Sequence, residues 1–310
     1  MGRGWLAFGI ALAVLGGCGD GSAEDVEPGR GGAIELTGWL PPASGYASAD
    51  LVALKRDLGL AEDADPLASS KLFEWIPGGW AGLYLSNPSK ETRAALQLSA
   101  ATEFAEMSIQ KDEQPVTAIR TSADTDEIRQ KLIDLGFVDR NGILEGPDGM
   151  RATGWEDTKP ELCGSAGGLE PCGDRDSYPE KGLAVKIEDD VILLSPDAAK
   201  LAVAPDDPGG PPLEVQSLLD ADVTYASGYD YQCVRQNGIA TSPDGTGEMA
   251  AIFEGSSEAL KITPEPGSEG VGQPVFDGDA VTVELDLPKP MGPRQFQSDE
   301  FAGISCANDG

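Results

Sequence analysis

Apolar residues follow two different periods along this chain, and their alternation constrains its fold more than any single motif does. One set has the spacing of a buried helix face and comprises Leu51, Leu54, Leu58, Ile128, Leu132 and Leu135. The other set forms short runs that are typical of strands and that dominate the last third of the sequence. We therefore predict an α+β domain in which amphipathic helices pack on an antiparallel or mixed sheet.

Local signals place several helices. Ser48 is the expected N-cap of the first, and Asp124 with Glu127 begins another in the manner of a capping box. Residues 91–107 keep a helical period and are predicted as the longest helix. A short helix is expected to begin at Ser195, with Pro196 in its first turn. The helices after Ser48 and Asp124 both end in Asp-Leu-Gly-apolar, which is either the usual helix stop used twice or a trace of an internal repeat.

The strand predictions rest on alternation and on short apolar runs between turn residues. They are 33–36, 80–85, 115–121, 143–144 or 150–155, 183–187, 191–194, 223–226, 249–253, 260–263 and 281–287. The segments 183–187 and 191–194 are expected to form a hairpin around three acidic residues.

The N-terminal residues have the composition of a secretory signal. Arg3 is followed by an apolar run from Trp5 to Leu15 and by two glycines. This run is too short for a membrane-spanning helix, which needs about 20 apolar residues. Residues 1–17 are therefore expected to be removed during export.

The end of this signal, Leu15-Gly16-Gly17-Cys18, resembles the lipobox of bacterial lipoproteins. The resemblance implies cleavage before Cys18, a lipid (including palmitate) on that cysteine, and a position at the cell membrane facing away from the cytoplasm. The alternative is an ordinary cleaved signal with an incidental cysteine. The resulting organisation is a signal peptide (1–17), a flexible acidic Gly-rich tether (18–32) and one α+β domain (33–306), with 156–181 as a potential internal boundary.

The charge of the chain limits its partners. The formal net charge is −31, and loss of the signal removes one arginine and no acid. This balance argues against binding to nucleic acid, whose phosphates attract Lys and Arg. It also argues against docking on anionic lipid head groups. The expected membrane contact is through the lipid at Cys18.

The chain contains no histidine, which excludes Ser-His-Asp and Cys-His catalytic sites. The commonest transition-metal ligand and the usual proton shuttle at neutral pH are excluded with it. A carboxylate-based hydrolytic site is still compatible with this composition.

Four cysteines follow Cys18, and an even number outside the cytoplasm indicates two disulfides. Three pairings are possible. We favour Cys163–Cys172, which are close in sequence, and therefore Cys233–Cys306. A zinc site is the rival, but the spacing typical of such sites is absent.

Three local clusters have the residue types of a functional site. Ser108 to Lys111 fits S-x-x-K, but the companion motifs of penicillin-binding proteins are missing, so we reject it. Tyr229-Asp230-Tyr231 is the one local aromatic–acid cluster and is predicted as a recognition surface. Asp174, Asp176 and Glu180 could hold a structural Ca²⁺, although they fail the EF-hand template. No other cofactor is predicted.

These observations favour a lipid-anchored surface lipoprotein that binds or scaffolds an envelope protein, glycan or small molecule without catalysis. One alternative is a carrier of a lipid or small solute. The other is a histidine-free envelope hydrolase that uses carboxylates.

Overall fold

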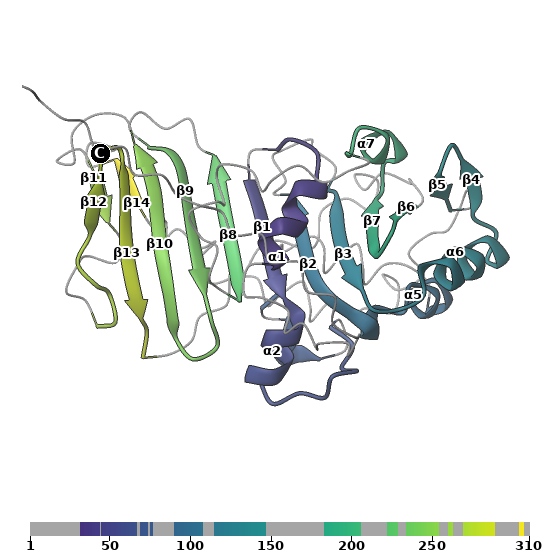
Figure 1. Cartoon of the computed structure of the whole chain (residues 1–310), viewed down its shortest axis with the longest axis horizontal. Helices are drawn as coiled ribbons and strands as arrows, with labels where there is room; N and C mark the ends of the chain where they lie inside the picture. The colour runs from purple at the N-terminus through teal and green to yellow at the C-terminus, as the bar shows by residue number, and fades with distance from the viewer. Residues whose placement is uncertain are drawn as a thin grey trace, which may run out of the picture.

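A single antiparallel sheet of 12 strands runs through the domain (Figure 1). The computed structural model describes residues 32–43, 45–66, 69–73, 75–76, 90–107, 115–146, 183–205, 222–228, 234–253, 260–262, 269–288 and 304–306. The sheet order is β12-β13-β10-β9-β8-β1-β2-β3-β7-β6-β5-β4, and β11 pairs with β14 in a second, two-stranded sheet. The predicted α+β class is confirmed, and the sheet is antiparallel rather than mixed.

The strands differ widely in length. They are β1 Gly45–Asp50, β2 Ala101–Met107, β3 Thr117–Thr121, β4 Val138–Arg140, β5 Ile143–Glu145, β6 Ala184–Glu188, β7 Val191–Ser195, β8 Val223–Gly228, β9 Val234–Thr241, β10 Thr246–Phe253, β11 Leu260–Ile262, β12 Val275–Asp277, β13 Ala280–Asp286 and β14 Ile304–Cys306. The predictions for β3, β6, β7, β8, β10, β11 and β13 are confirmed to within a few residues. The predicted strand 143–144 is confirmed as part of β5, and its alternative, 150–155, lies outside the described residues.

The helices are short. They are α1 Gly32–Glu35, α2 Leu51–Asp57, α3 Ser70–Phe73, α5 Lys90–Leu96, α6 Thr125–Asp134 and α7 Ala198–Ala202, with 3-10 turns η1 Leu36–Trp39 and η2 Leu98–Ala100. In the part of the chain that is described, none of the helices is long and apolar enough to cross a membrane.

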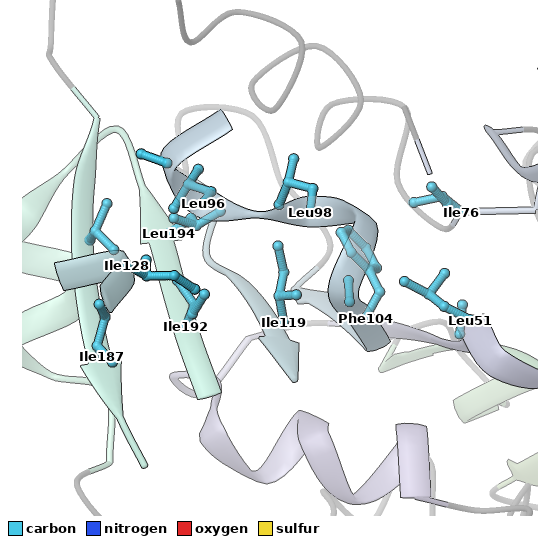
Figure 2. Packing of buried hydrophobic residues seen from close by; sticks show 14 of the residues in the cluster. Leu51, Ile76, Leu96, Leu98, Phe104, Ile119, Ile128, Ile187, Ile192 and Leu194 are labelled. Carbon is cyan, nitrogen blue, oxygen red and sulfur yellow. The ribbon is translucent and has the colours of Figure 1, made fainter. Parts of the chain in front are cut away.

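Helices cover the half of the sheet that contains β1 to β7 on both sides. On what we call the first face, apolar side chains of α2, α5 and α6 pack on strand residues such as Phe104, Ile119 and Ile192 (Figure 2). On the second face, α1, η1 and α7 pack on strand residues such as Ala105 and Leu193. Because side chains alternate along a strand, neighbouring apolar residues serve the two faces.

A separate apolar cluster lies in the other half of the sheet. It contains Met249, Val281 and Val283 of β10 and β13, together with Ile262 of β11. The register places these strand residues on the first face, so here the small sheet β11–β14, rather than helices, contributes to the cover.

Two helices end as the sequence predicts. Leu60 N donates to the Lys55 carbonyl oxygen at 2.8 Å and Phe137 N to that of Leu132 at 3.1 Å. The glycines before them have φ +64° and +94°, which an L residue adopts only with strain. The start of α6 is also confirmed, because Asp124 Oδ1 accepts from Asp126 N and Glu127 N.

Three local predictions are wrong. Ser48 belongs to β1, and the N-cap of α2 is Asp50, which accepts from Ala53 N at 2.9 Å. The N-cap of α7 is Asp197 rather than Ser195. Residues 33–36, predicted as a strand, form the end of α1 and the beginning of η1.

The longest predicted helix, 91–107, is instead a helix followed by a strand. α5 stops after Leu96, where Gln97 takes a left-handed φ of +48°, and β2 begins at Ala101. β2 lies between β1 and β3 with six of its seven residues buried, so apolar side chains are needed on both of its faces. Continuous burial removes the alternation that identifies a strand and leaves a pattern that resembles a helical one.

The sheet contains an internal repeat that the sequence does not reveal. Counted outward from the centre, β1-β2-β3-β7-β6 and β8-β9-β10-β13-β12 follow the same chain order, and the central strands β1 and β8 are antiparallel. This arrangement is that of two five-stranded units related by a twofold axis normal to the sheet between β1 and β8.

The last hairpin of each unit supports the equivalence. Each hairpin has a two-residue turn, Asp189-Asp190 or Gly278-Asp279, whose first residue has positive φ. Thr121 N donates to the Asp190 carbonyl oxygen at 3.0 Å, and Phe253 N makes the corresponding bond to that of Asp279 at 2.8 Å. The repeated Asp-Leu-Gly helix endings are not part of this relation, because they follow β1 and β3, which occupy different places in one unit.

Candidate functional site

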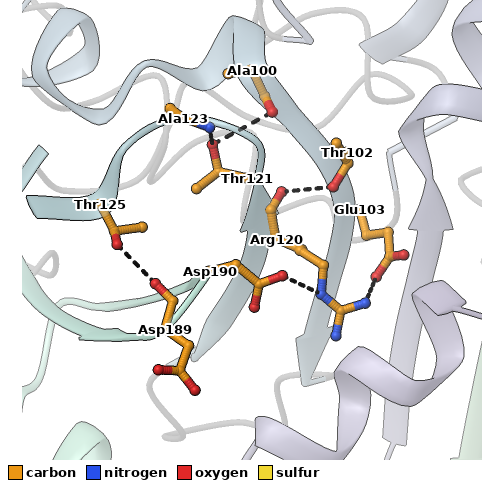
Figure 3. A network of polar contacts seen from close by, with 9 residues as sticks. All are labelled: Ala100, Thr102, Glu103, Arg120, Thr121, Ala123, Thr125, Asp189 and Asp190. Atoms are coloured by element: carbon orange, nitrogen blue, oxygen red, sulfur yellow. Dashed lines mark hydrogen bonds and ion pairs between the residues drawn. The ribbon is translucent and has the colours of Figure 1, made fainter. Parts of the chain in front are cut away.

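A chain of ion pairs on the second face joins β2, β3 and the β6–β7 turn (Figure 3). Glu103 and Arg120 are register partners, and Arg120 Nη1 lies 2.6 Å from Glu103 Oε2. Arg120 Nε lies 3.2 Å from Asp190 Oδ2. The Glu103 side chain is 9% exposed and that of Asp190 57%, so the pairs run from the interior to the surface.

Acidic groups surround this arginine. Asp50 is the register partner of Glu103 on β1 and is also buried. Burial raises the pKa of Glu103 to about 7; Arg120 opposes this rise, and Asp50, Asp190 and Glu35 add to it. Burial also raises the pKa of Asp50, against the hydrogen bonds from the first turn of α2. The cluster therefore contains a carboxyl group that gains and loses its proton around neutral pH.

Further hydrogen bonds fix the ends of these strands. Thr125 Oγ1 donates to the Asp189 carbonyl oxygen at 2.8 Å, and Thr102 Oγ1 donates to that of Arg120 at 3.3 Å. Thr121 Oγ1 accepts from Ala123 N at 3.1 Å. The turn that carries Asp190 is thus held against the start of α6.

Lys55 is a second buried charge with a defined set of acceptors. Its Nζ donates to the carbonyl oxygens of Glu62 at 2.8 Å, Ser99 at 3.2 Å and Ala101 at 3.4 Å. Burial lowers its pKa, while Asp63, Asp65 and Glu62 oppose that change. Three acceptors match the three N–H groups of an ammonium, which is the arrangement of a structural lysine rather than of a nucleophile.

The ion-pair cluster can take up a proton on Glu103. Glu103 is engaged by a guanidinium, and Asp50 is engaged as a helix cap. Among the residues that the structure describes, no group of three His, Cys, Asp or Glu is placed to hold a metal ion. The geometry fits a pH-sensitive link between strands better than an acid–base pair facing a substrate.

Most residues singled out from the sequence lie outside the described ranges. These are Cys18, Ser108, Lys111, Cys163, Cys172, Asp174, Asp176, Glu180, Tyr229, Asp230, Tyr231 and Cys233, together with the predicted strand 80–85 and the boundary segment 156–181. Cys306 lies in β14, where it is the register partner of Leu260. The aromatic cluster, the Ca²⁺ site and the disulfides remain predictions.

Glu103 and Arg120 are not among the site residues predicted from the sequence. Arg120 is a single charged residue in a correctly predicted strand, which is a usable signal of a buried or paired charge. Glu103 was hidden because its segment was predicted as a helix. Only the register between β2 and β3 brings the two together.

Comparison with known proteins does not identify a family for this chain. No protein-family model matches the chain, and no curated protein matches it. Crystal form I of TP0453 is similar with a TM-score of 0.45 and 8% identity over 84% of this chain and 94% of that one. Crystal form III of TP0453 gives a TM-score of 0.35 and 8% identity over 81% and 92%. At this level the likeness assigns neither a family nor a function to the chain.

Proposed function

We propose that this protein is a lipid-anchored lipoprotein of the cell envelope with a non-enzymatic binding or scaffolding role. The observation that carries the proposal is Leu15-Gly16-Gly17-Cys18, which follows an apolar run and precedes an acidic, Gly-rich stretch. In this account Cys18 is the first mature residue and its acyl chains hold the protein at the membrane. Each buried CH₂ contributes roughly 0.8 kcal/mol, so two or more chains give firm attachment.

The acidic, Gly-rich residues after Cys18 are proposed to act as a tether between the lipid and the domain. The domain is packed from its first turn onward, because Ile34 and Leu36 are fully buried. A Gly-rich stretch of the length of the tether spans about 20 Å on average, which would let the acidic domain stand off an anionic membrane surface.

The described buried charges support a role without catalysis. Glu103 pairs with Arg120, and Lys55 donates to three carbonyl oxygens. Groups engaged in this way link strands and loops and are not poised to attack a substrate. In this account the protein acts by binding or scaffolding rather than by catalysis.

The proposal is tested by fractionating cells that express the full chain or its Cys18→Ala variant. We expect the unmodified protein in the membrane fraction, released by detergent but not by high salt. The variant should accumulate as unprocessed precursor or leave the cells. Ser22→Ala is the matched control, because it changes a residue outside the lipobox and should fractionate like the unmodified protein. Detergent-dependent membrane association of mature, processed Cys18→Ala would refute the anchor.

A further inference from the structure

The internal repeat makes the outer edge of β12 equivalent to the outer edge of β6. β6 and β12 are the fifth strands of the two units, and each forms a hairpin with the strand before it in the sheet. The outer edge of β6 is occupied, because β5 pairs with it through Ile143 opposite Lys186 and Leu144 opposite Val185. Within the described residues, the outer edge of β12 has no partner strand and ends the sheet (Figure 1).

Two apolar side chains of β12 are partly open to solvent, which is unusual for an edge strand that is protected against pairing. Val275 is 62% exposed and Phe276 is 44% exposed. Phe276 meets Phe253 edge-on with ring centroids 6.2 Å apart, so its ring is placed by the core while much of its surface is open. Val275 pairs with Thr282 and Phe276 with Val281, which places the two side chains on opposite faces of the sheet.

β5 shows what an occupant of such an edge must supply. Its adjacent residues Ile143 and Leu144 belong to the apolar clusters of the second and the first face, respectively. One short strand thus covers apolar surface on both faces. A strand added to β12 would likewise need two adjacent apolar residues, one to pack against Val275 and the other to pack against Phe276.

Charge selects among the candidate occupants. Residues 269–288 contain five acidic residues, namely Glu269, Asp277, Asp279, Glu284 and Asp286, and no Lys or Arg. A second copy of this chain, paired edge to edge, would bring the same acidic residues together and be repelled. A basic segment would instead be attracted to this edge.

We propose that the outer edge of β12 binds an extended, basic segment of a partner protein, which adds to the sheet as β5 adds to β6. Main-chain hydrogen bonds would supply affinity, and the apolar contacts with Val275 and Phe276 would supply specificity. Pro274 has no N–H, so the added ladder is confined to the region of β12 itself. The inference specifies a class of partner for the proposed binding role, and it rests on that role.

The test uses the full chain and a labelled synthetic peptide derived from the β4–β5 hairpin. The peptide has the sequence of residues 138–145 with Asp139→Lys and Glu145→Lys, which keeps the adjacent apolar pair and makes it basic. We expect saturable binding by fluorescence anisotropy at low salt. Val275→Asp in the protein should weaken binding at least about tenfold, a change of 1.4 kcal/mol or more. This variant makes the edge more acidic, so its loss of binding cannot be explained by weaker electrostatic attraction.

Val203→Asp is the matched protein control, because Val203 is 65% exposed beside α7 and should leave binding unchanged. A scrambled peptide of the same composition should bind at least about tenfold more weakly. The proposal is overturned by absence of peptide binding, by equal binding of the scrambled peptide or of Val275→Asp, or by dimerisation of the protein alone that Val275→Asp abolishes. None of these results depends on Cys18, so fractionation still tests the lipid anchor independently.

Discussion

At the residue scale, Glu103 carries the main energetic consequence of the fold. It occupies a buried strand position opposite Arg120 and beside Asp50. The guanidinium of Arg120 does not cancel the cost of burying the negative charge of Glu103. Burial therefore raises the pKa of Glu103 from 4.5 to about 7. The folded protein therefore holds a proton on Glu103 at pH values where the unfolded chain has released it.

This proton makes stability depend on pH with a definite sign. The contribution of Glu103 is fully present below about pH 4.5 and is lost as the pH rises through about 7, because the ionised form is the one that burial disfavours. Glu103→Gln should remove this dependence. The difference in unfolding free energy between the two proteins should change by up to about 3 kcal/mol across that window, measured by urea denaturation at several pH values. Parallel pH profiles for the two proteins would contradict the assignment.

At the element scale, short-range signals predict some parts of this fold and miss others. α6 was predicted from its capping aspartate and its glycine stop, and the β6–β7 hairpin from its apolar strands and acidic turn. These features are determined within a few residues of chain. β1 and β2 lie in the interior of the sheet and are buried on both faces, so they lack the alternation that would identify them.

The same limit explains why the candidate site could not be predicted from the sequence. Glu103 and Arg120 are 17 residues apart in sequence and meet only through the register of two strands, one of which was taken for a helix. The repeat is equally hidden, because its equivalent strands differ in sequence. It becomes visible only in the sheet order and in the matching turns of the two hairpins.

The cap of α6 gives a prediction at this scale. Asp124 accepts from two backbone N–H groups that otherwise have no partner within the helix. Asp124→Ala should lower the unfolding free energy by about 1 kcal/mol, measured by urea denaturation. Asp126→Ala is the control, since this exposed first-turn acid interacts only with the helix dipole and should cost about 0.3–0.5 kcal/mol. Equal effects of the two substitutions would refute the capping role.

At the scale of the whole molecule, the described residues form a continuous sheet that contains two equivalent five-stranded units and is extended at one end by β5 and β4. One unit is covered by helices, and the other is covered in part by the small sheet β11–β14. β14 contacts β9 and β10, and Cys306 is its last residue. Cys233 directly precedes β9 in sequence. The predicted Cys233–Cys306 disulfide would join the end of β14 to the residue before β9.

That disulfide predicts a specific peptide map. Protein exported by its host and digested without reductant should yield a linked pair of peptides containing Cys233 and Cys306, and alkylation should detect no free thiol. Replacing either cysteine by serine should destabilise the domain by about 4 kcal/mol in the chain-entropy model, to a similar extent for both. Linkage of Cys233 to Cys163 or Cys172 would refute this pairing.

The proposed lipid anchor at Cys18 can be tested by mass spectrometry of the mature N-terminal peptide. The protein would be extracted with detergent from the membranes of its own host, digested, and its N-terminal peptide sequenced. The account predicts a peptide that begins at Cys18 and carries acyl chains on that residue. A mature chain that starts elsewhere, or that begins at an unmodified Cys18, would contradict it.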